Sequence, residues 1–214
     1  VQTVVVPVCL VRKWGQPVGN PQFDSISRFT NNNNFGVWDF NSRNQVAAGK
    51  TSFEPAALHE FVHAIGFASY VEDVQDNRIR IWDLFRLPAS APVDGSISLQ
   101  VFGNTPRMLR PGQEAVGVFL SGPNYRRLST GDPGGDGQTA SHWKDDALLA
   151  LENPPGEWIG LMDPFAPLVV PGFLTGADIG AIDAFGWRIA GNAMGPPAPP
   201  LLDLPGPDAT GVSE

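Results

Sequence analysis

The strongest pattern of hydrophobic and polar positions in the chain runs from about Glu54 to Gly66. Ser52 can cap the start of a helix here, and Pro55 is tolerated in a first helical turn. Gly66 can end the helix in a left-handed turn. The segment therefore predicts a helix, whose apolar faces are formed by Ala56, Ala57, Phe61, Val62, Ala64 and Ile65.

A second helix is predicted from Thr175 to Phe185. Thr175 and Asp178 have the spacing of a capping box in which Asp replaces Glu. The apolar residues of this segment share one helical face: Ile179, Ile182 and Phe185.

Short strands and turns are predicted elsewhere, because 24 glycines and 21 prolines interrupt most of the chain. Residues 3–11 are rich in β-branched side chains and predict a strand, with Pro7 favouring an edge position. The other strand candidates are 36–40, 45–50 and 116–120, and the segment 81–87 fits either a strand or a helix.

The chain has 214 residues, of which 42% are hydrophobic, so it is long enough for one domain with a real core. We expect that domain over residues 1–193, followed by a Pro-rich tail or linker over residues 194–214. The net charge of -8 argues against binding to nucleic acid or to anionic membrane surfaces. No apolar run reaches the roughly 18 residues that predict a membrane span.

The candidate chemistry lies in the first predicted helix, at His59-Glu60-Phe61-Val62-His63. Two histidines four positions apart on a helix have Cβ atoms about 5–6 Å apart. Both imidazoles can therefore reach one zinc ion at about 2.0–2.1 Å. Glu60 follows the first histidine, where it can take a proton from a zinc-bound water.

Zinc catalysis needs a third protein ligand and an open fourth position. The chain holds three histidines, and the remaining one, His142, is the expected third ligand. The rival ligands are the carboxylates that follow the helix: Glu72, Asp73, Asp76 and Asp83.

The segment His59–Gly66, HEFVHAIG, resembles the HExxHxxG core of the metzincin clan of zinc peptidases. The clan usually places a third His or Asp where this chain has Ser69. The leishmanolysin-like branch departs in the same way, with HExxHxxGF, a long insertion and a distant His followed by Trp. This chain has Phe67 after the glycine, and His142-Trp143 begins 79 residues past His63 (142 − 63).

Two later segments extend the resemblance. Gly160–Pro164, GLMDP, is similar to the Met-turn, in which Met162 would lie beneath the metal without binding it. Residues 174–187 are similar to the end of a family of bacterial secreted metallopeptidases. The resemblance implies an α+β, zincin-like fold: a twisted mixed sheet over the active-site helix, with His142 and Met162 in an irregular C-terminal half.

The function implied is that of a zinc endopeptidase, secreted or on the cell surface of a bacterium and acting as a monomer on a protein or peptide substrate. His59, His63 and His142 would hold one Zn²⁺, and Glu60 would act as the general base. Carboxylates should orient the ligand imidazoles, and the candidates are Asp163, Asp178 and Asp183, with capping favoured for Asp178. Tyr70 and Tyr125 are the only phenols for a second electrophile, and neither lies in a motif.

Two other functions stay open at this point. The first is a non-catalytic surface or matrix module stabilised by zinc, against which Glu60 argues because a structural site needs no base. The second is a zinc hydrolase of non-peptide amides.

Two further segments have alternative interpretations. Gly131–Gly137 could bind a structural Ca²⁺ through Asp132 and Asp136, although a turn leading to His142 is favoured because the D-x-D-x-D-G spacing is absent. Cys9, the single cysteine, excludes an intrachain disulfide. It could cap the zinc in a latent form, but a structural thiol is favoured.

Overall fold

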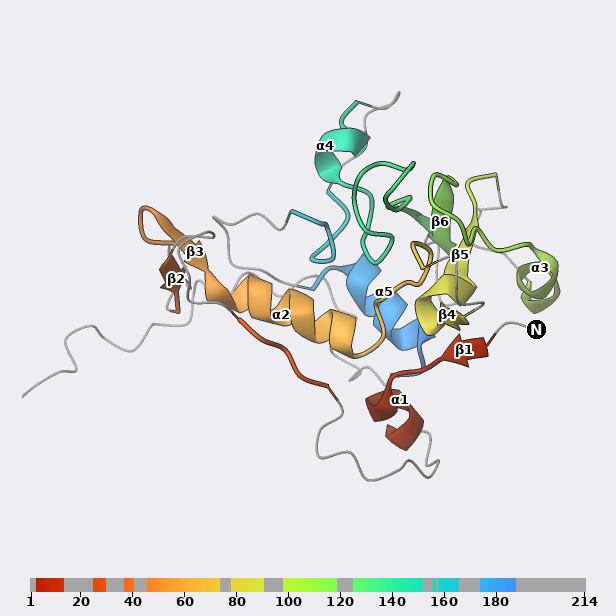
Figure 1. The fold of residues 1–214 in the computed structure, drawn as a ribbon, viewed down its shortest axis with the longest axis horizontal. Helices are drawn as coiled ribbons and strands as arrows, with labels where there is room; N and C mark the ends of the chain where they lie inside the picture. Colours follow the sequence, from red (N-terminus) through yellow and green to blue (C-terminus); the bar gives the residue numbers. More distant parts are fainter. Residues whose placement is uncertain are drawn as a thin grey trace, which may run out of the picture.

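The computed structural model describes residues 3–13, 25–29, 37–40, 46–73, 78–90, 98–118, 125–151, 156, 158–165 and 174–187. Short helices and strands alternate along this part of the chain (Figure 1). The helices are α1 (Val8–Lys13), α2 (Phe53–Ala64), α3 (Leu99–Asn104), α4 (Asp146–Leu149) and α5 (Gly176–Ala184), with a 3-10 helix η2 (Ile81–Phe85). The tail predicted over residues 194–214 lies outside the described residues.

The strands form three small sheets among the described residues. Strands β1 (Thr3–Val5) and β4 (Arg78–Arg80) pair in parallel, as do β2 (Val37–Asp39) and β3 (Lys50–Ser52). Strands β5 (Arg86–Pro88), β6 (Ala115–Val118) and β7 (Tyr125–Leu128) form an antiparallel sheet in that order. The α+β class is confirmed, but these three sheets stand where one twisted mixed sheet was expected. Strands of three or four residues, broken by turns, present too few backbone groups to build a wide sheet.

Both predicted helices are present. Helix α2 ends close to the expected residue, and Gly66 has a φ of 136° in the turn that follows. A Cβ at Gly66 would lie 3.1 Å from the ring of Phe185, so this glycine also allows the two helices to approach. Helix α5 begins with the predicted capping box between Thr175 and Asp178.

The N-terminal strand prediction is wrong in its second half, because residues 8–13 are helical. Pro7 explains the change, since it cannot donate a sheet hydrogen bond and its fixed φ suits the start of a helix. Its carbonyl accepts from the amide of Val11 at 3.1 Å. The segment predicted as strand at 45–50 becomes extended only at Lys50, after a turn in which Gly49 has a φ of 73°. Residues 81–87 divide into the 3-10 helix and the start of β5.

Aromatic side chains form the centre of the core. Phe67, which follows α2, stacks on Trp82 with ring centroids 4.0 Å apart and meets Trp143 edge-on at 4.9 Å. All three side chains are fully buried, and Phe185 from the end of α5 packs against Phe67 and Trp82. The core therefore joins the end of α2, the 3-10 helix, the segment around Trp143 and α5.

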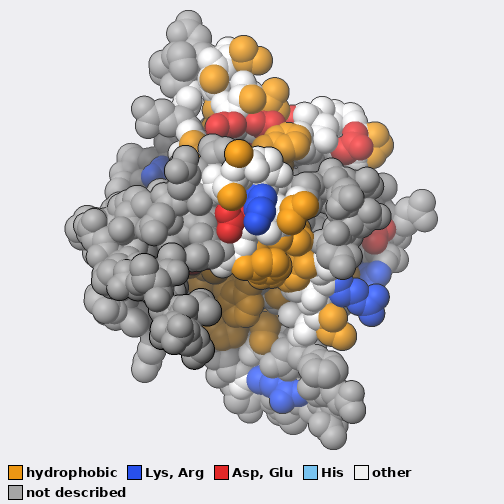
Figure 2. Space-filling model, turned by 90° about the vertical axis from the view of Figure 1, so that its left-hand side faces the viewer, with side chains coloured by type: hydrophobic (Ala, Val, Ile, Leu, Met, Phe, Trp, Pro, Cys, Tyr) orange, Lys and Arg blue, Asp and Glu red, His pale blue; other side chains and the backbone are white. Residues whose placement is uncertain are grey.

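At the end of the molecule around β2 and β3, large hydrophobic side chains are exposed and not buried. Phe40 is 76% exposed and Val37 is 57% exposed, while the rings of Phe29, Trp38 and Phe40 surround Phe53. Hydrophobic side chains gather in the middle of the face that Figure 2 shows, which looks onto the molecule from this side. None of the helices in the described ranges has both the length and the hydrophobicity that a membrane span requires.

Candidate metal centre

Helix α2 supplies two histidines to the site from consecutive turns. His59 and His63 lie on one face of the helix with ring centroids 4.7 Å apart, as their four-residue spacing requires. Val62 is buried in the core and fixes the rotation of the helix about its axis. Glu60 and Phe61 lie between the two histidines in the sequence and are exposed.

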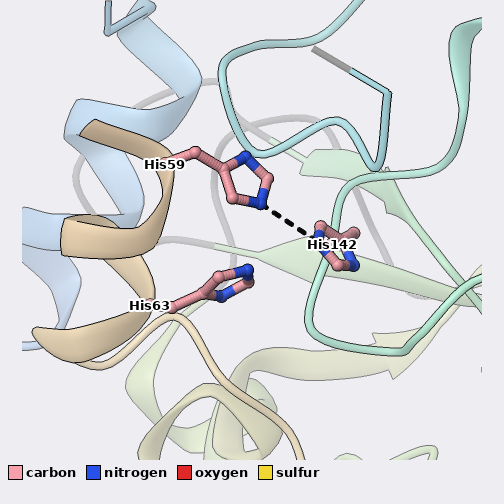
Figure 3. A group of neighbouring side chains, drawn as sticks. All are labelled: His59, His63 and His142. Atoms are coloured by element: carbon pink, nitrogen blue, oxygen red, sulfur yellow. Dashed lines mark hydrogen bonds between the residues drawn. The ribbon is translucent and has the colours of Figure 1, made fainter. Parts of the chain in front are cut away.

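A loop from the second half of the chain brings His142 to the same point. Its ring centroid lies 5.2 Å from that of His59 and 4.9 Å from that of His63 (Figure 3). The backbone on each side is tied down, because the carbonyl of His142 accepts from the amide of Ser129 at 3.2 Å and the amide of Trp143 donates to the carbonyl of Met162 at 2.9 Å. The potential ligand atoms of the three histidines all lie within 4.8 Å of one another.

Backbone carbonyls orient the three imidazoles. His59 Nδ1 lies 2.8 Å from the carbonyl oxygen of Leu161, and His63 Nδ1 lies 2.5 Å from that of Phe67. His142 Nδ1 has two oxygens of Thr139 beside it, the hydroxyl at 2.7 Å and the carbonyl at 3.2 Å. A carbonyl can only accept, so the hydrogen-bond network places a proton on Nδ1 and leaves the lone pair on Nε2.

The Nε2 atoms of His59 and His142 fit a metal ion. His59 Nε2 and His142 Nε2 are 3.2 Å apart, and with both protons on Nδ1 their lone pairs face each other. A cation between them removes that repulsion. Two nitrogens bound tetrahedrally to zinc at about 2.0–2.1 Å stand about 3.3 Å apart, which matches the distance found. The group is therefore chemically suited to zinc.

Burial keeps two of the histidines neutral. Burial lowers the pKa of His63 to about 4, with the neighbouring His59 adding to the effect and the Phe67 carbonyl opposing it. Burial, followed by the charges of His63 and His59, lowers the pKa of His142 to about 3. Neutral imidazole is the form that binds a metal, so protons compete weakly for these two side chains near neutral pH.

The Gly160–Pro164 turn contacts His59, and Asp178 of α5 holds this turn in place. The buried Asp178 carboxylate accepts from the amides of Leu161 at 2.9 Å and Met162 at 3.3 Å, and from the indole of Trp143 at 2.8 Å. A Cβ at Gly160 would approach the same carboxylate to 2.5 Å, so only glycine fits there. Asp178 thus connects the turn that orients His59 with the residue that follows His142.

The rival third ligands have other roles. Glu72 accepts a hydrogen bond from the amide of Ala140. Asp83 accepts from the hydroxyl of Ser69 at 2.6 Å and from the amide of Tyr70 at 3.1 Å. Asp73 is exposed, and Asp76 lies outside the described residues.

The prediction that carboxylates orient the imidazoles is wrong for the residues described, since carbonyl oxygens do so. The reason is local: the chain passes close to each ring as it leaves a helix or turn, so a carbonyl is already in reach. Asp163 instead accepts from the amides of Asp146 and Phe165, and burial raises its pKa to about 6. It forms an acidic cluster with Asp145 and Asp146. Asp183 lies in α5 and belongs neither to this cluster nor to the three-histidine group.

The remaining candidates lie elsewhere. The carboxylate of Asp136 accepts from the amides of Thr130 and Gln138, which fits the turn expected over Gly131–Gly137. The thiol of Cys9 donates to the carbonyl of Ala64 at 3.7 Å, at the end of α2. The ring of Tyr70 lies beneath the guanidinium of Arg80 at 4.2 Å. The side chain of Tyr125 lies outside the described part.

Sequence reasoning missed one residue near the site. Arg86 is fully buried, and its guanidinium contacts the backbone of the segment that carries His142. The available signal was the arginine in IWDLFRL, a segment whose only other polar residue is Asp83, because a solvated side chain is out of place in so apolar a run.

Comparisons with protein-family models, with curated proteins and with solved structures found no match to this chain. A functional assignment therefore rests on the residues and on their geometry.

Proposed function

We propose that this protein is a zinc-dependent endopeptidase of the metzincin type, with His59, His63 and His142 as zinc ligands and Glu60 as general base. The observation that carries the proposal is the meeting of three imidazoles whose Nδ1 atoms are engaged with oxygens, so that Nε2 is left for a metal. Glu60 follows the first of these histidines directly, as the chemistry of a metal-activated water requires.

An open coordination position favours catalysis over a structural zinc site. Structural zinc is closed by four protein ligands, whereas catalytic zinc has three and keeps one position for water or substrate. Within the described ranges, no fourth His, Cys, Asp or Glu joins the group of His59, His63 and His142. This supports an enzyme over a module that uses zinc only for stability.

The catalytic roles follow from this arrangement. Bound zinc supplies Lewis acidity, which lowers the pKa of water toward about 7 and polarises a scissile carbonyl. The carbonyls of Leu161, Phe67 and Thr139 hold the imidazoles in place. The exposed Glu60 accepts the proton of the attacking water and returns it to the leaving amine.

The metzincin assignment is supported by the Gly160–Pro164 turn. Its Leu161 carbonyl is bonded to His59, and Met162 is fully buried. From the same resemblance we place the enzyme outside a bacterial cell, as a monomer acting on proteins or peptides. Recovery of the protein only from the cytoplasm, or as a stable dimer in solution, would contradict these two points.

The test is the substitution Glu60→Gln, assayed on a broad peptide library with zinc loaded to one equivalent. Loss of the general base should lower kcat/KM by about 10²–10⁴-fold while zinc content stays unchanged. Glu54→Gln is the matched control, because Glu54 is an exposed glutamate in the first turn of the same helix, and its activity should equal that of the wild type. If the zinc-loaded wild type cleaves no peptide but does cleave simple amides, the protein is an amide hydrolase and the peptidase proposal is wrong.

A further inference from the structure

We propose that Arg86 and Glu72 are positioning residues for the third zinc ligand, because together they fix the loop 129–143 that points His142 at helix α2. The proposal rests on the zinc site of the proposed function, but not on peptidase activity. Neither side chain is one of the three histidines that would hold the metal.

Arg86 joins both ends of this loop. Its Nη2 donates to the carbonyl of Ser129 at 2.9 Å, and its Nη1 donates to the carbonyl of Ala140 at 3.0 Å. Its Nε donates to the carbonyl of Met108 at 3.2 Å, so the planar guanidinium uses all three of its nitrogens. The side chain is fully buried in strand β5, which gives the loop a rigid support.

The two anchored residues lie next to His142 in space and in sequence. Ser129 donates from its amide to the carbonyl of His142 at 3.2 Å and from its hydroxyl to the carbonyl of Trp143 at 2.7 Å. Ala140 lies two positions before His142. A displacement of Ser129 or Ala140 therefore moves the backbone that carries the ligand.

Glu72 binds the backbone amide of Ala140, whose carbonyl is bound by Arg86. Its carboxylate accepts from the amide of Ala140, while the carbonyl of Ala140 accepts from Arg86 and from the indole of Trp82 at 3.3 Å. Both the donor and the acceptor of this residue are thus fixed by side chains from the first half of the chain. Glu72 follows α2, so it links the loop to the helix that carries His59 and His63.

The electrostatics explain why a charged group is retained in this position. Burial lowers the pKa of Arg86, and the charges of Asp83, Glu72 and Asp136 oppose that effect. A buried guanidinium is tolerated only where acceptors and opposite charges surround it. Glu72 and Asp136 also bond backbone amides of the same loop, at Ala140 and Thr130, so the neutralising charges act on the segment that Arg86 holds.

The first test compares zinc affinity, measured by chelator competition, in the wild type and Arg86→Lys. Lysine keeps the charge but loses the planar fork that reaches three carbonyls. We expect zinc binding to weaken by about 10–100-fold, the usual cost of losing an outer partner of a metal ligand. The control is Leu87→Ala, because Leu87 is the next residue of β5, equally buried, and packs in a separate cluster with Val116. It should lower Tm without changing zinc affinity.

A double-mutant cycle shows whether Arg86 acts through His142. In a His142→Ala background, Arg86→Lys should weaken the residual zinc binding no further, since the ligand that it positions is gone. An equal loss in both backgrounds would overturn the proposal, and so would wild-type affinity in Arg86→Lys. Hydrogen exchange of the metal-free protein gives a second readout, in which the amides of Ser129 and Trp143 should exchange faster in Arg86→Lys than in Leu87→Ala.

Glu72 provides the test if Arg86→Lys does not fold. Glu72→Ala removes the acceptor for the Ala140 amide and should weaken zinc binding about 10-fold, whereas Glu72→Gln keeps an acceptor oxygen and should restore most of the affinity. Equal affinity in these two variants would overturn the role of Glu72. If the wild type binds zinc but cleaves nothing, only the peptidase proposal is contradicted. If the wild type binds no zinc, both proposals are contradicted. If zinc affinity is unchanged by substitution of Arg86 and of Glu72, only the positioning role of these two residues is contradicted.

Discussion

Helix α2 brings two histidines to the site within one stretch of sequence, whereas the loop 129–143 brings the third from 79 residues beyond His63 (142 − 63). The helix needs only its own backbone geometry to place His59 and His63 on one face. The loop has no such regular frame. Its position depends on contacts with β5, the 3-10 helix, the Gly160–Pro164 turn and α5.

The difference lies in what carries the information. On the helix side it is a four-residue spacing that can be seen in the sequence. On the loop side it is a set of buried polar groups, among them Arg86 and Asp178, that bond to backbone atoms. Local helix geometry therefore places His59 and His63, whereas long-range contacts place His142. The helix side and the loop side should respond differently to substitution.

The largest expected effect comes from removing one histidine from each side. His63→Ala and His142→Ala should each weaken zinc binding by more than about 100-fold, the upper cost of losing only an outer partner. Their metal-free forms should differ. Alanine favours the helix, so α2 should stay protected from hydrogen exchange in His63→Ala. His142→Ala also removes the contacts with Thr139, so exchange at Ser129 and Trp143 should rise. Equal protection of the loop in both variants would contradict the comparison.

The same division explains what the sequence could predict. Helix α2, its histidines and Glu60 follow from spacing and end signals, and the capping box of α5 follows from Thr175 and Asp178. His142 could be named because the chain has only three histidines, and its approach to the other two is found in the structure.

The missed features depend on long-range contacts. Asp178 was expected to act mainly as a cap, and it does cap α5, but it also bonds Trp143 and Leu161, which local sequence does not reveal. The same holds for Arg86 and for the short strand β4, whose partner β1 lies far away along the chain. The helical segment at Val8–Lys13 was mistaken for a strand, because β-branched residues favour extended backbone only until Pro7 redirects the chain.

A smaller effect is expected from Asp178→Asn, which acts on the loop side. The amide group replaces one carboxylate oxygen and turns N–H toward the donors of Leu161 or Trp143. Losing a buried acceptor in this way should cost about 3 kcal/mol, since each unsatisfied donor costs about 1–3 kcal/mol. Tm should fall by roughly 6–12 °C, at about 2–4 °C per kcal/mol for a chain of this size.

Zinc affinity separates this effect from general destabilisation. Asp178→Asn should weaken zinc binding, because the Leu161 carbonyl orients His59 and Trp143 adjoins His142. Leu87→Ala, with a comparable loss of Tm from the core, should leave zinc affinity unchanged. An unchanged Tm in Asp178→Asn would show that the carboxylate does not support the turn.

The smallest effect expected near neutral pH is the titration of His63 and His142 in the metal-free protein. This titration compares the helix side with the loop side directly. Burial lowers the pKa of His63 to about 4 and that of His142 to about 3, so in an NMR titration His63 should take up its proton first as the pH falls. A lowered pKa in the folded state gives stability that is present above the ordinary value of 6.5 and is lost as the pH falls through about 4 and then 3.

Asp163 acts in the opposite direction, because its pKa is raised to about 6. Its contribution to the free energy of unfolding is therefore complete below pH 3.8 and is lost as the pH rises through 6. The free energy of unfolding of the metal-free protein should therefore fall less steeply below pH 6.5 in His63→Ala and in His142→Ala than in the wild type. Asp163→Asn should steepen that fall, because it removes the opposing contribution. Midpoints near 6.5 for His63 and His142 in the metal-free wild type would mean that these two imidazoles are solvated, and the packing of the three-histidine group would then be wrong.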